Sequence, residues 1–213
     1  MSVESESRGA VSAPTAIIGL ILAAGESARM GRDKALLEYR SRTFLETILA
    51  TLHEAGIERT IVVLGHHAED IRRSVDLRTA QVVVNRDYRS GQTSSLQAGL
   101  RALDANEPDG IVMCLVDHPA MTADTLRQLI HAFASTGKPV VIPECHGKHG
   151  HPILVGRELF GDLRALGPDS GADQVIRKYR DQTQFVEVTD PGILLDVDDP
   201  EAYRQLTAPQ RQS

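Results

Sequence analysis

Short apolar runs alternate along this chain with segments whose apolar residues recur at helical spacing. The runs, each of a length typical of a buried strand, cover residues 17–22, 60–64, 81–84, 110–115 and 139–142. The helical patterns cover residues 43–55, 68–75, 94–103 and 123–135. Near-continuous runs of Val and Ile are typical of strands that are buried on both faces. The alternation therefore predicts an α/β fold with a mostly parallel sheet and helices on both faces.

The last third of the chain has weaker patterns. They predict strands over 151–155 and 184–188 and helices over 157–165 and 172–179. A closing helix is expected over 199–206, with Asp199 as its N-cap and Pro200 at its first helical position. Parallel sheets of this kind bind ligands beyond the carboxyl ends of their strands, so the polar residues that follow strands are the first candidates for a site.

Length and composition favour one domain. The chain has 213 residues, of which 41% are apolar, enough for one substantial core. Residues 1–14 are rich in Ser, Glu, Gly and Pro and are expected to be a disordered leader, and residues 209–213 to be a tail. We therefore expect a single doubly wound, Rossmann-like domain over residues 15–208.

Charge and cysteine content exclude some classes of function. The net charge of −6 and the pI near 5.7 argue against a general nucleic-acid binder and against binding to an anionic membrane surface. The two cysteines, Cys114 and Cys145, are too few for a disulfide framework, and Cys114 lies in an apolar run. No apolar stretch approaches a membrane span and the polar start lacks a signal segment, so a soluble, cytoplasmic protein is expected.

The segment after the first predicted strand carries the strongest chemical signal. It combines glycines at 25 and 31 with the cations Arg29, Arg32 and Lys34. Backbone N–H groups and cations in such a loop can surround a polyphosphate. The segment matches neither G-x-x-x-x-G-K-[ST] nor G-x-G-x-x-G, the two common phosphate-binding patterns.

The same segment resembles the L-A-A-G-x-x-x-R-M-G-x-x-K signature of nucleotidyltransferases, and most closely the molybdenum cofactor cytidylyltransferases and guanylyltransferases. The resemblance extends over residues 17 to about 206. It implies a nucleotide contact for each residue that matches the signature: Leu22, Ala23, Ala24, Gly25, Arg29, Met30, Gly31 and Lys34. A surface loop that is merely basic is the alternative.

A strand-end aspartate is the first metal candidate. Asp117 follows the apolar run 111–116, and the family places a metal-binding aspartate in a similar position. Such a carboxylate can hold Mg²⁺, which commonly bridges phosphate oxygens. The alternative is a turn or helix-capping aspartate before Pro119. Val116 and His118 depart from the Gly and Gln more usual in the family, which weakens the assignment of the acceptor.

A second acidic cluster lies near the C-terminus. Asp196 and Asp198 would share one face of an extended segment. The resemblance to a D-[IV]-D-x-P-E motif makes Asp198 the better candidate for completing the metal shell, with Asp196 the weaker one. Helix capping is the competing interpretation.

A third segment resembles the family's N-x-x-[YWF]-x-x-G-x-x-[ST]-S motif. Its matching residues are Asn85, Tyr88, Gly91, Ser94 and Ser95. Free N–H groups at a helix start, together with hydroxyls, suit a base, a ribose or a phosphate, so Asn85, Gly91, Ser94 and Ser95 are expected to contact the nucleotide. Alternatively, Ser94 only caps the helix and Asn85 only makes a turn.

Histidines give weaker signals. His151 lies in a Gly-His-Pro sequence like that of the cytidylyltransferase branch, where it could contact the acceptor phosphate or serve a structural role. Cys145, His146 and His149 lie nearby, but their spacing lacks the paired Cys-x-x-Cys of a structural zinc site. The pair at 66 and 67 is expected at a loop or helix start without chemistry of its own.

Together these motifs predict a Mg²⁺-dependent nucleotidyltransferase that transfers a nucleoside monophosphate in line. The sequence offers no nucleophile with an adjacent general base, which agrees with direct attack of an acceptor phosphate on the α-phosphorus. Arg29 and Lys34 would hold the triphosphate, with Mg²⁺ on Asp117 and Asp198, so Arg29, Lys34 and Asp117 are the candidate catalytic residues. Ala24 and Arg32 replace glycines of the guanylyltransferase branch and would narrow the base pocket, which favours CTP.

The resemblance implies a molybdopterin-type phosphate as acceptor and a molybdoenzyme as a client protein. A sugar-phosphate or alcohol-phosphate nucleotidyltransferase on the same fold is an alternative. A non-catalytic nucleotide-binding chaperone is another, although it could have lost the charged residues that this chain keeps. An oxidoreductase that uses a dinucleotide lacks its glycine fingerprint here.

Overall fold

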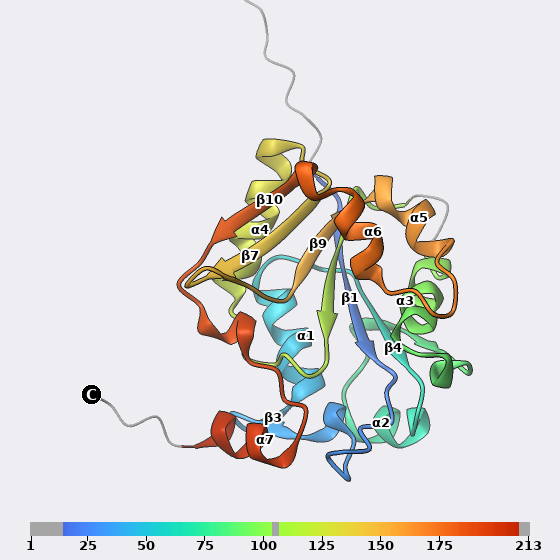
Figure 1. The fold of residues 1–213 in the computed structure, drawn as a ribbon. Helices are drawn as coiled ribbons and strands as arrows, with labels where there is room; N and C mark the ends of the chain where they lie inside the picture. Colours follow the sequence, from blue (N-terminus) through green and yellow to red (C-terminus); the bar gives the residue numbers. More distant parts are fainter. Residues whose placement is uncertain (1–14, 104–106, 209–213) are drawn as a thin grey trace, which may run out of the picture.

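A central sheet organises the molecule, for which the computed structural model describes residues 15–103 and 107–208 (Figure 1). In this part of the chain, eight strands form one sheet: β1 (Ile17–Ala23), β4 (Thr60–Leu64), β5 (Ala80–Val84), β6 (Gly110–Leu115), β7 (Val140–Cys145), β8 (Lys148–His149), β9 (Ile153–Gly156) and β10 (Thr183–Glu187). Their order is β10-β7-β9-β6-β1-β4-β5, with β8 paired to β7. The strands β5, β4, β1 and β6 are parallel, while β9 runs antiparallel to β6 and β7.

The strand order creates a crevice at the centre of the sheet. From β1 the chain builds β4 and β5 on one side and then returns to add β6 on the other side of β1. The carboxyl ends of β1 and β6 therefore lie side by side where the strand order reverses, which is the usual ligand position in open α/β sheets. The predicted Rossmann-like, mostly parallel single-domain fold is confirmed.

Helices cover both faces of the sheet because the strands are apolar on both sides. One core contains Ile21, Val62 and Val112 and is covered by α1 (Phe44–Glu54), α2 (Ala68–Ser74) and α4 (Ala123–Thr136). The other contains Leu20, Val63 and Ile111 and is covered by α3 (Gln92–Arg101), α5 (Phe160–Arg164) and α6 (Ala172–Lys178). Neighbouring strand residues thus alternate between the two cores.

Several short elements differ from the sequence expectations. A hairpin of β2 (Glu38–Tyr39) and β3 (Arg42–Thr43) was not expected, because two-residue strands leave no periodic pattern. The helix expected over 157–165 divides into a 3₁₀ turn, η3 (Arg157–Leu159), and α5. The other 3₁₀ turns are η1 (Lys34–Leu36), η2 (Tyr88–Ser90), η4 (Arg180–Gln182) and η5 (Pro191–Leu194).

The last helix, α7 (Pro200–Thr207), returns the end of the chain to the segment that follows β1 (Figure 1). Asp199 caps it by accepting hydrogen bonds from the N–H groups of Glu201 and Ala202, each at 2.9 Å, as expected. The Tyr203 hydroxyl donates to the carbonyl of Glu38 at 2.9 Å, and Val197 is buried in the same small cluster as Met30. The C-terminal acidic segment is therefore held beside the basic loop.

The expected leader and tail lie outside the described residues. Within those residues, none of the helices has the length and apolar character needed to cross a membrane.

Candidate active site at the carboxyl ends of β1 and β6

The candidate site begins where two neighbouring strands end. Leu22 in β1 pairs with Leu115 in β6, and the Val116 N–H donates to the Leu22 carbonyl at 3.2 Å. The basic loop after β1 and Asp117 after β6 consequently start side by side, although Lys34 and Asp117 are 83 positions apart in the chain.

The basic loop is fixed by its own hydrogen bonds. Ser27 accepts from the Met30 N–H at 2.9 Å through its carbonyl and from the Lys34 N–H at 3.1 Å through its hydroxyl. Gly31 has a φ of +64°, which explains why glycine stands there. Met30 is buried in the core beneath the loop rather than turned toward the cavity described below. These contacts set the direction in which Arg29 and Lys34 leave the backbone.

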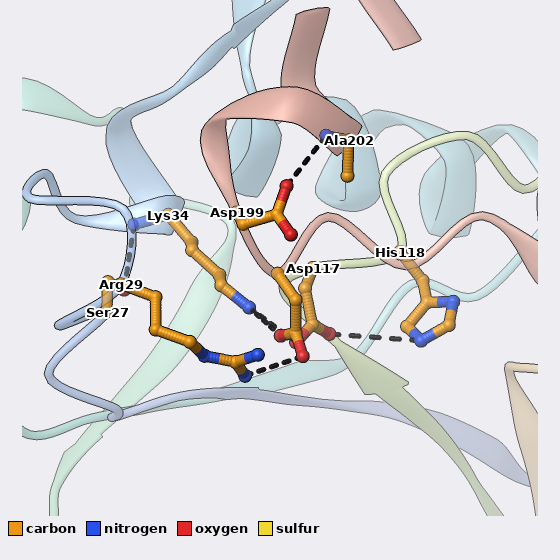
Figure 2. Close-up of polar contacts among 8 residues, drawn as sticks. Ser27, Arg29, Lys34, Asp117, His118, Asp199 and Ala202 are labelled. Carbon is orange, nitrogen blue, oxygen red and sulfur yellow. Dashed lines mark hydrogen bonds and ion pairs between the residues drawn. The ribbon is translucent and has the colours of Figure 1, made fainter. Parts of the chain in front are cut away.

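Two cations and two carboxylates meet at this point. The Lys34 ammonium lies 3.0 Å from Asp117 Oδ2 and 2.6 Å from Asp198 Oδ1, and the Arg29 guanidinium lies 2.6 Å from Asp198 Oδ2. Figure 2 shows Arg29 and Lys34 reaching from the loop toward Asp117. The Val197 N–H donates to the Asp117 carbonyl at 3.0 Å, which holds the C-terminal acidic segment against the end of β6. The structure thus brings together the four charged residues that the sequence singled out.

The electrostatics of the cluster follow from these contacts. Burial works to lower the pKa of Lys34, but hydrogen bonds and ion pairs with Asp198 and Asp117 outweigh it and the net pKa is raised. Hydrogen bonds from Lys34 and then Arg29 lower the pKa of Asp198. Burial, followed by repulsion from Asp117 and Asp198, raises the pKa of Asp196. Lys34 is therefore a firmly charged ammonium inside an acidic surrounding.

A cavity of about 350 Å³ opens over this cluster. Most of the predicted nucleotide-contacting residues line it, together with the predicted metal ligands Asp117 and Asp198: Leu22, Ala23, Ala24, Gly25, Arg29, Lys34, Gly91 and Ser95. A Cβ atom built on Gly25 would meet nothing within 4 Å, so the backbone there faces open space and a ligand can approach it closely. The cavity lies in the crevice that the strand order predicts.

Some predicted residues lie outside the lining of the cavity. Gly31 and His151 do not line the cavity. Arg32 is exposed and does not line it either, so of the two residues expected to narrow the base pocket, Ala24 and Arg32, only Ala24 can do so. Asn85 and Ser94 are buried behind it. The Asn85 amide donates to the hydroxyls of Ser94 at 2.8 Å and Ser95 at 3.0 Å. This arrangement fixes Ser95, which does line the cavity, at the start of α3.

The cavity also has lining residues that the sequence did not identify as candidates. They include Ser27, Asp33, Ile71, Gln92 and Leu115, together with Tyr88, which was quoted only as part of a motif. Asp33 Oδ2 lies 2.7 Å from His67 Nδ1, and the backbone of His67 is left-handed, with a φ of 51°. One indication in the sequence that Asp33 lines the site was its position next to Lys34. That position does not distinguish Asp33 from an ordinary loop aspartate.

The side of Asp117 away from Lys34 also carries polar groups (Figure 2). Asp117, His118 and Asp196 each offer one ligand atom, and these atoms all lie within 4.8 Å of one another. Asp117 Oδ1 is buried and has no hydrogen-bond partner among the described residues. An unpaired buried carboxylate oxygen is costly unless a cation or donor approaches it, so these residues fit a divalent metal.

Two histidine rings lie on the same side. The centroids of His118 and His151 are 4.9 Å apart. Burial lowers the pKa of His118, and burial followed by the neighbouring His118 lowers the pKa of His151 to about 4. Both imidazoles are therefore neutral at physiological pH, when a ring nitrogen can bind a metal or accept a hydrogen bond.

Comparisons with known proteins identify the family. Residues 19–183 match the MobA-like NTP transferase domain. The chain is 30% identical over 202 residues to nicotine blue oxidoreductase from Paenarthrobacter nicotinovorans, covering 89% of this chain and 96% of that one. It is 26% identical over 201 residues to molybdenum cofactor cytidylyltransferase from Escherichia coli K12, covering 92% and 97%.

A solved structure resembles the whole domain. Rv0371C from Mycobacterium tuberculosis H37Rv, in complex with manganese, superposes with a TM-score of 0.77 at 32% identity, covering 91% of this chain and 98% of that one. A divalent metal is thus present in a structural relative. The match over residues 19–183 spans well over half of the chain and includes the basic loop and Asp117. This protein therefore belongs to the MobA-like NTP transferase domain family and is a nucleotidyltransferase.

Proposed function

We propose that this nucleotidyltransferase uses a divalent metal, expected to be Mg²⁺, to transfer CMP from CTP to a phosphate-bearing small molecule such as molybdopterin. An oxygen of the acceptor phosphate would attack the α-phosphorus of the nucleotide. The bond from the α-phosphorus to the bridging oxygen would break, and pyrophosphate would leave. A relative of similar length is named for cytidylyl transfer to the molybdenum cofactor, which supports this choice of substrates.

One observation carries the proposal: the cations of the loop after β1 meet Asp117, which follows β6, and Asp198, which precedes α7, at one cavity. Arg29 and Lys34 come from residues close to the N-terminal strand, and Asp198 lies near the other end of the chain. A stable core does not need such a convergence of charge at the rim of a cavity. Phosphoryl transfer does need it, because its catalysis consists of positioning and charge neutralisation.

The residues have separable roles in this proposal. Arg29 and Lys34 would exchange their carboxylate partners for phosphate oxygens when a triphosphate enters. Backbone N–H groups at Gly25 and at the start of α3 would support the same phosphates. Asp117, with one of the downstream aspartates Asp198 and Asp196, would hold the metal. A divalent cation there would neutralise charge on the α-phosphate and on the leaving pyrophosphate.

The preference for CTP rests on the cavity wall. Ala24 is buried and lines the cavity, where the guanylyltransferase branch has glycine. Its methyl group packs against the turn at Gly65, where an added Cβ would lie 2.9 Å from Ala24 Cβ. Ala24 therefore has little space to move aside for a purine base, which supports the smaller pyrimidine base of CTP.

A second candidate function is oxidoreduction, favoured by the relative named nicotine blue oxidoreductase. The chain lacks the glycine fingerprint of dinucleotide-binding domains, and its cavity carries an acidic and basic cluster suited to a triphosphate with a metal. We therefore rank it second.

Pyrophosphate release measures the proposed reaction directly. The purified chain is incubated with CTP, GTP, ATP or UTP and a divalent cation, with and without molybdopterin or other phosphate acceptors. We expect release with CTP only when a phosphate acceptor is present, and loss of release on removing the metal with a chelator. Nucleotide binding without transfer to any acceptor would favour the chaperone. Oxidation of NADH or NADPH coupled to reduction of a dye, without pyrophosphate release, would favour the oxidoreductase.

A further inference from the structure

The two oxygens of Asp117 have different surroundings. Oδ2 accepts from the Lys34 ammonium at 3.0 Å and faces the cavity. Oδ1 is buried and unpaired among the described residues. His118 Nε2 lies 4.0 Å from Oδ1, which is too long for a hydrogen bond. A gap of this size between an acceptor and an imidazole nitrogen is wide enough for both to bind one cation.

His118 is itself an unusual buried residue. It is only 8% exposed, and its Nδ1 atom is buried with no hydrogen-bond partner in the described part of the chain. Buried polar groups are nearly always hydrogen-bonded, and leaving one unpaired costs about 1–3 kcal/mol. The imidazole is therefore not held in place by a hydrogen bond to Nδ1, and its other nitrogen, Nε2, lies 4.0 Å from Asp117 Oδ1.

Asp196 supplies the third group. One of its carboxylate oxygens lies within 4.8 Å of the ligand atoms of Asp117 and His118. The backbone contact from Val197 to Asp117 keeps it there. Asp198 differs, because its two oxygens are taken by Lys34 and Arg29 at 2.6 Å each. Of the two downstream aspartates, Asp196 is the one that forms a three-residue group with Asp117 and His118.

We propose that His118, through Nε2, binds the divalent metal together with Asp117 and Asp196, and that this imidazole makes the site favour Mn²⁺ or a later first-row ion over Mg²⁺. Imidazole suits transition metals, whereas Mg²⁺ prefers oxygen ligands and water. The inference rests on the metal dependence proposed above. It adds a nitrogen ligand and selects Asp196 over Asp198 as the second carboxylate.

Pulsed electron paramagnetic resonance of the chain with Mn²⁺ tests the nitrogen ligand without any measurement of activity. A directly bound imidazole imposes nitrogen modulation on the Mn²⁺ echo. We expect this modulation in the unaltered chain and its loss in His118→Gln. Mn²⁺ affinity should fall about tenfold in that variant, while Mg²⁺ affinity changes by less than about threefold.

Two control variants test whether other histidines supply the nitrogen ligand. Asp33, His66 and His67 form a second group that could hold an ion, so a His66→Gln/His67→Gln double variant must keep the modulation. His151→Gln must keep it too, because His151 is not part of the three-residue group at Asp117. Asp196→Asn should weaken Mn²⁺ binding more than Asp198→Asn does.

Each possible result either supports the proposed role of His118 or overturns it. Mn²⁺ that binds in an Asp117-dependent manner without nitrogen modulation would overturn the role of His118 but leave the proposed metal-dependent transfer intact. Loss of modulation in the His66/His67 variant would also overturn it, by assigning the ion to the other group. No binding of Mn²⁺ or Mg²⁺, with or without CTP, would remove the metal from both proposals. Should His118→Gln fail to fold, modulation that persists in a chain lacking His66, His67 and His151 excludes those three histidines, and its loss on the further change Asp117→Asn places the nitrogen ligand beside Asp117, whereas its persistence would overturn the proposal.

Discussion

Replacement of Lys34 by methionine removes an ammonium that lies between two carboxylates while keeping an unbranched side chain. The Lys34 side chain is 11% exposed, and its partners Asp117 and Asp198 are 23% and 36% exposed. Removing one member of a fully buried ion pair costs about 3–5 kcal/mol. Because both partners here keep some access to water, we expect a smaller loss of about 1–3 kcal/mol in the free energy of unfolding.

The same change should act on catalysis and on metal binding in opposite directions. Loss of a preorganised cation at the triphosphate should lower kcat/KM for CTP at least about a hundredfold, or about 2.7 kcal/mol. Divalent-metal affinity should rise, because Asp117 and Asp198 no longer have Lys34 as a counter-ion. General misfolding would weaken both properties, so the opposite signs separate a local electrostatic effect from a damaged fold.

The assays are urea unfolding, pyrophosphate release and metal titration. Lys178→Met is the matched control, because Lys178 makes an ion pair of 3.5 Å with Asp162 at the surface, where its side chain is 65% exposed. Such a pair contributes about 0–1 kcal/mol, and we expect little change in any of the three assays. A folded Lys34→Met variant whose kcat/KM stays within about threefold of the unaltered chain would refute the phosphate-binding role.

Three further predictions concern the frame of the site. Gly65→Ala places a Cβ 2.6 Å from the carbonyl oxygen of Ala24, so we expect weaker CTP binding by calorimetry; an unchanged Kd would contradict the close packing of that loop. Asp190→Ala removes an acceptor of four hydrogen bonds, two of them from Thr122, and should cost about 3 kcal/mol in urea unfolding, whereas a loss below about 1 kcal/mol would contradict it. Burial raises the pKa of the Cys114 thiol, so no reactive thiolate forms near neutral pH and a disulfide reagent should modify it only on unfolding; rapid modification of the native chain would be the contrary result.

The elements that the sequence located best are those with strong periodicity. The expected strands at 60–64 and 110–115 have those bounds in the structure, because their residues are apolar on both faces and the chain around them is polar. Helix α4 was placed to within one residue, since its apolar stripe and its Thr122 cap agree. The hairpin of β2 and β3 was not predicted because strands of two residues leave no periodic pattern, although the hairpin contacts α7 through Glu38 and Tyr203.

The chemistry of the site was predictable as a set of residues but not as an arrangement. The basic loop and Asp117 could be recognised from local motifs. That they meet depends on β6 being inserted beside β1 after two intervening strands, which the alternation of elements does not specify. The resemblance favoured Asp198 over Asp196 as a metal ligand, but the ion pairs of Asp198 with Lys34 and Arg29 could not be predicted, because they depend on how an irregular segment turns after η5. His118 was noticed only as a departure from the Gln more usual in the family, which does not indicate a metal ligand.

A crystal structure of the chain with Mg²⁺ and a non-hydrolysable CTP analogue is the most direct test of the central claim. We expect the triphosphate against the backbone of the loop after β1, with Arg29 and Lys34 in contact with its oxygens and the ion bound at Asp117. An analogue ordered elsewhere on the molecule, or bound in the cavity with its phosphates turned away from Lys34 and Asp117, would contradict the assignment of this cavity as the site of nucleotidyl transfer.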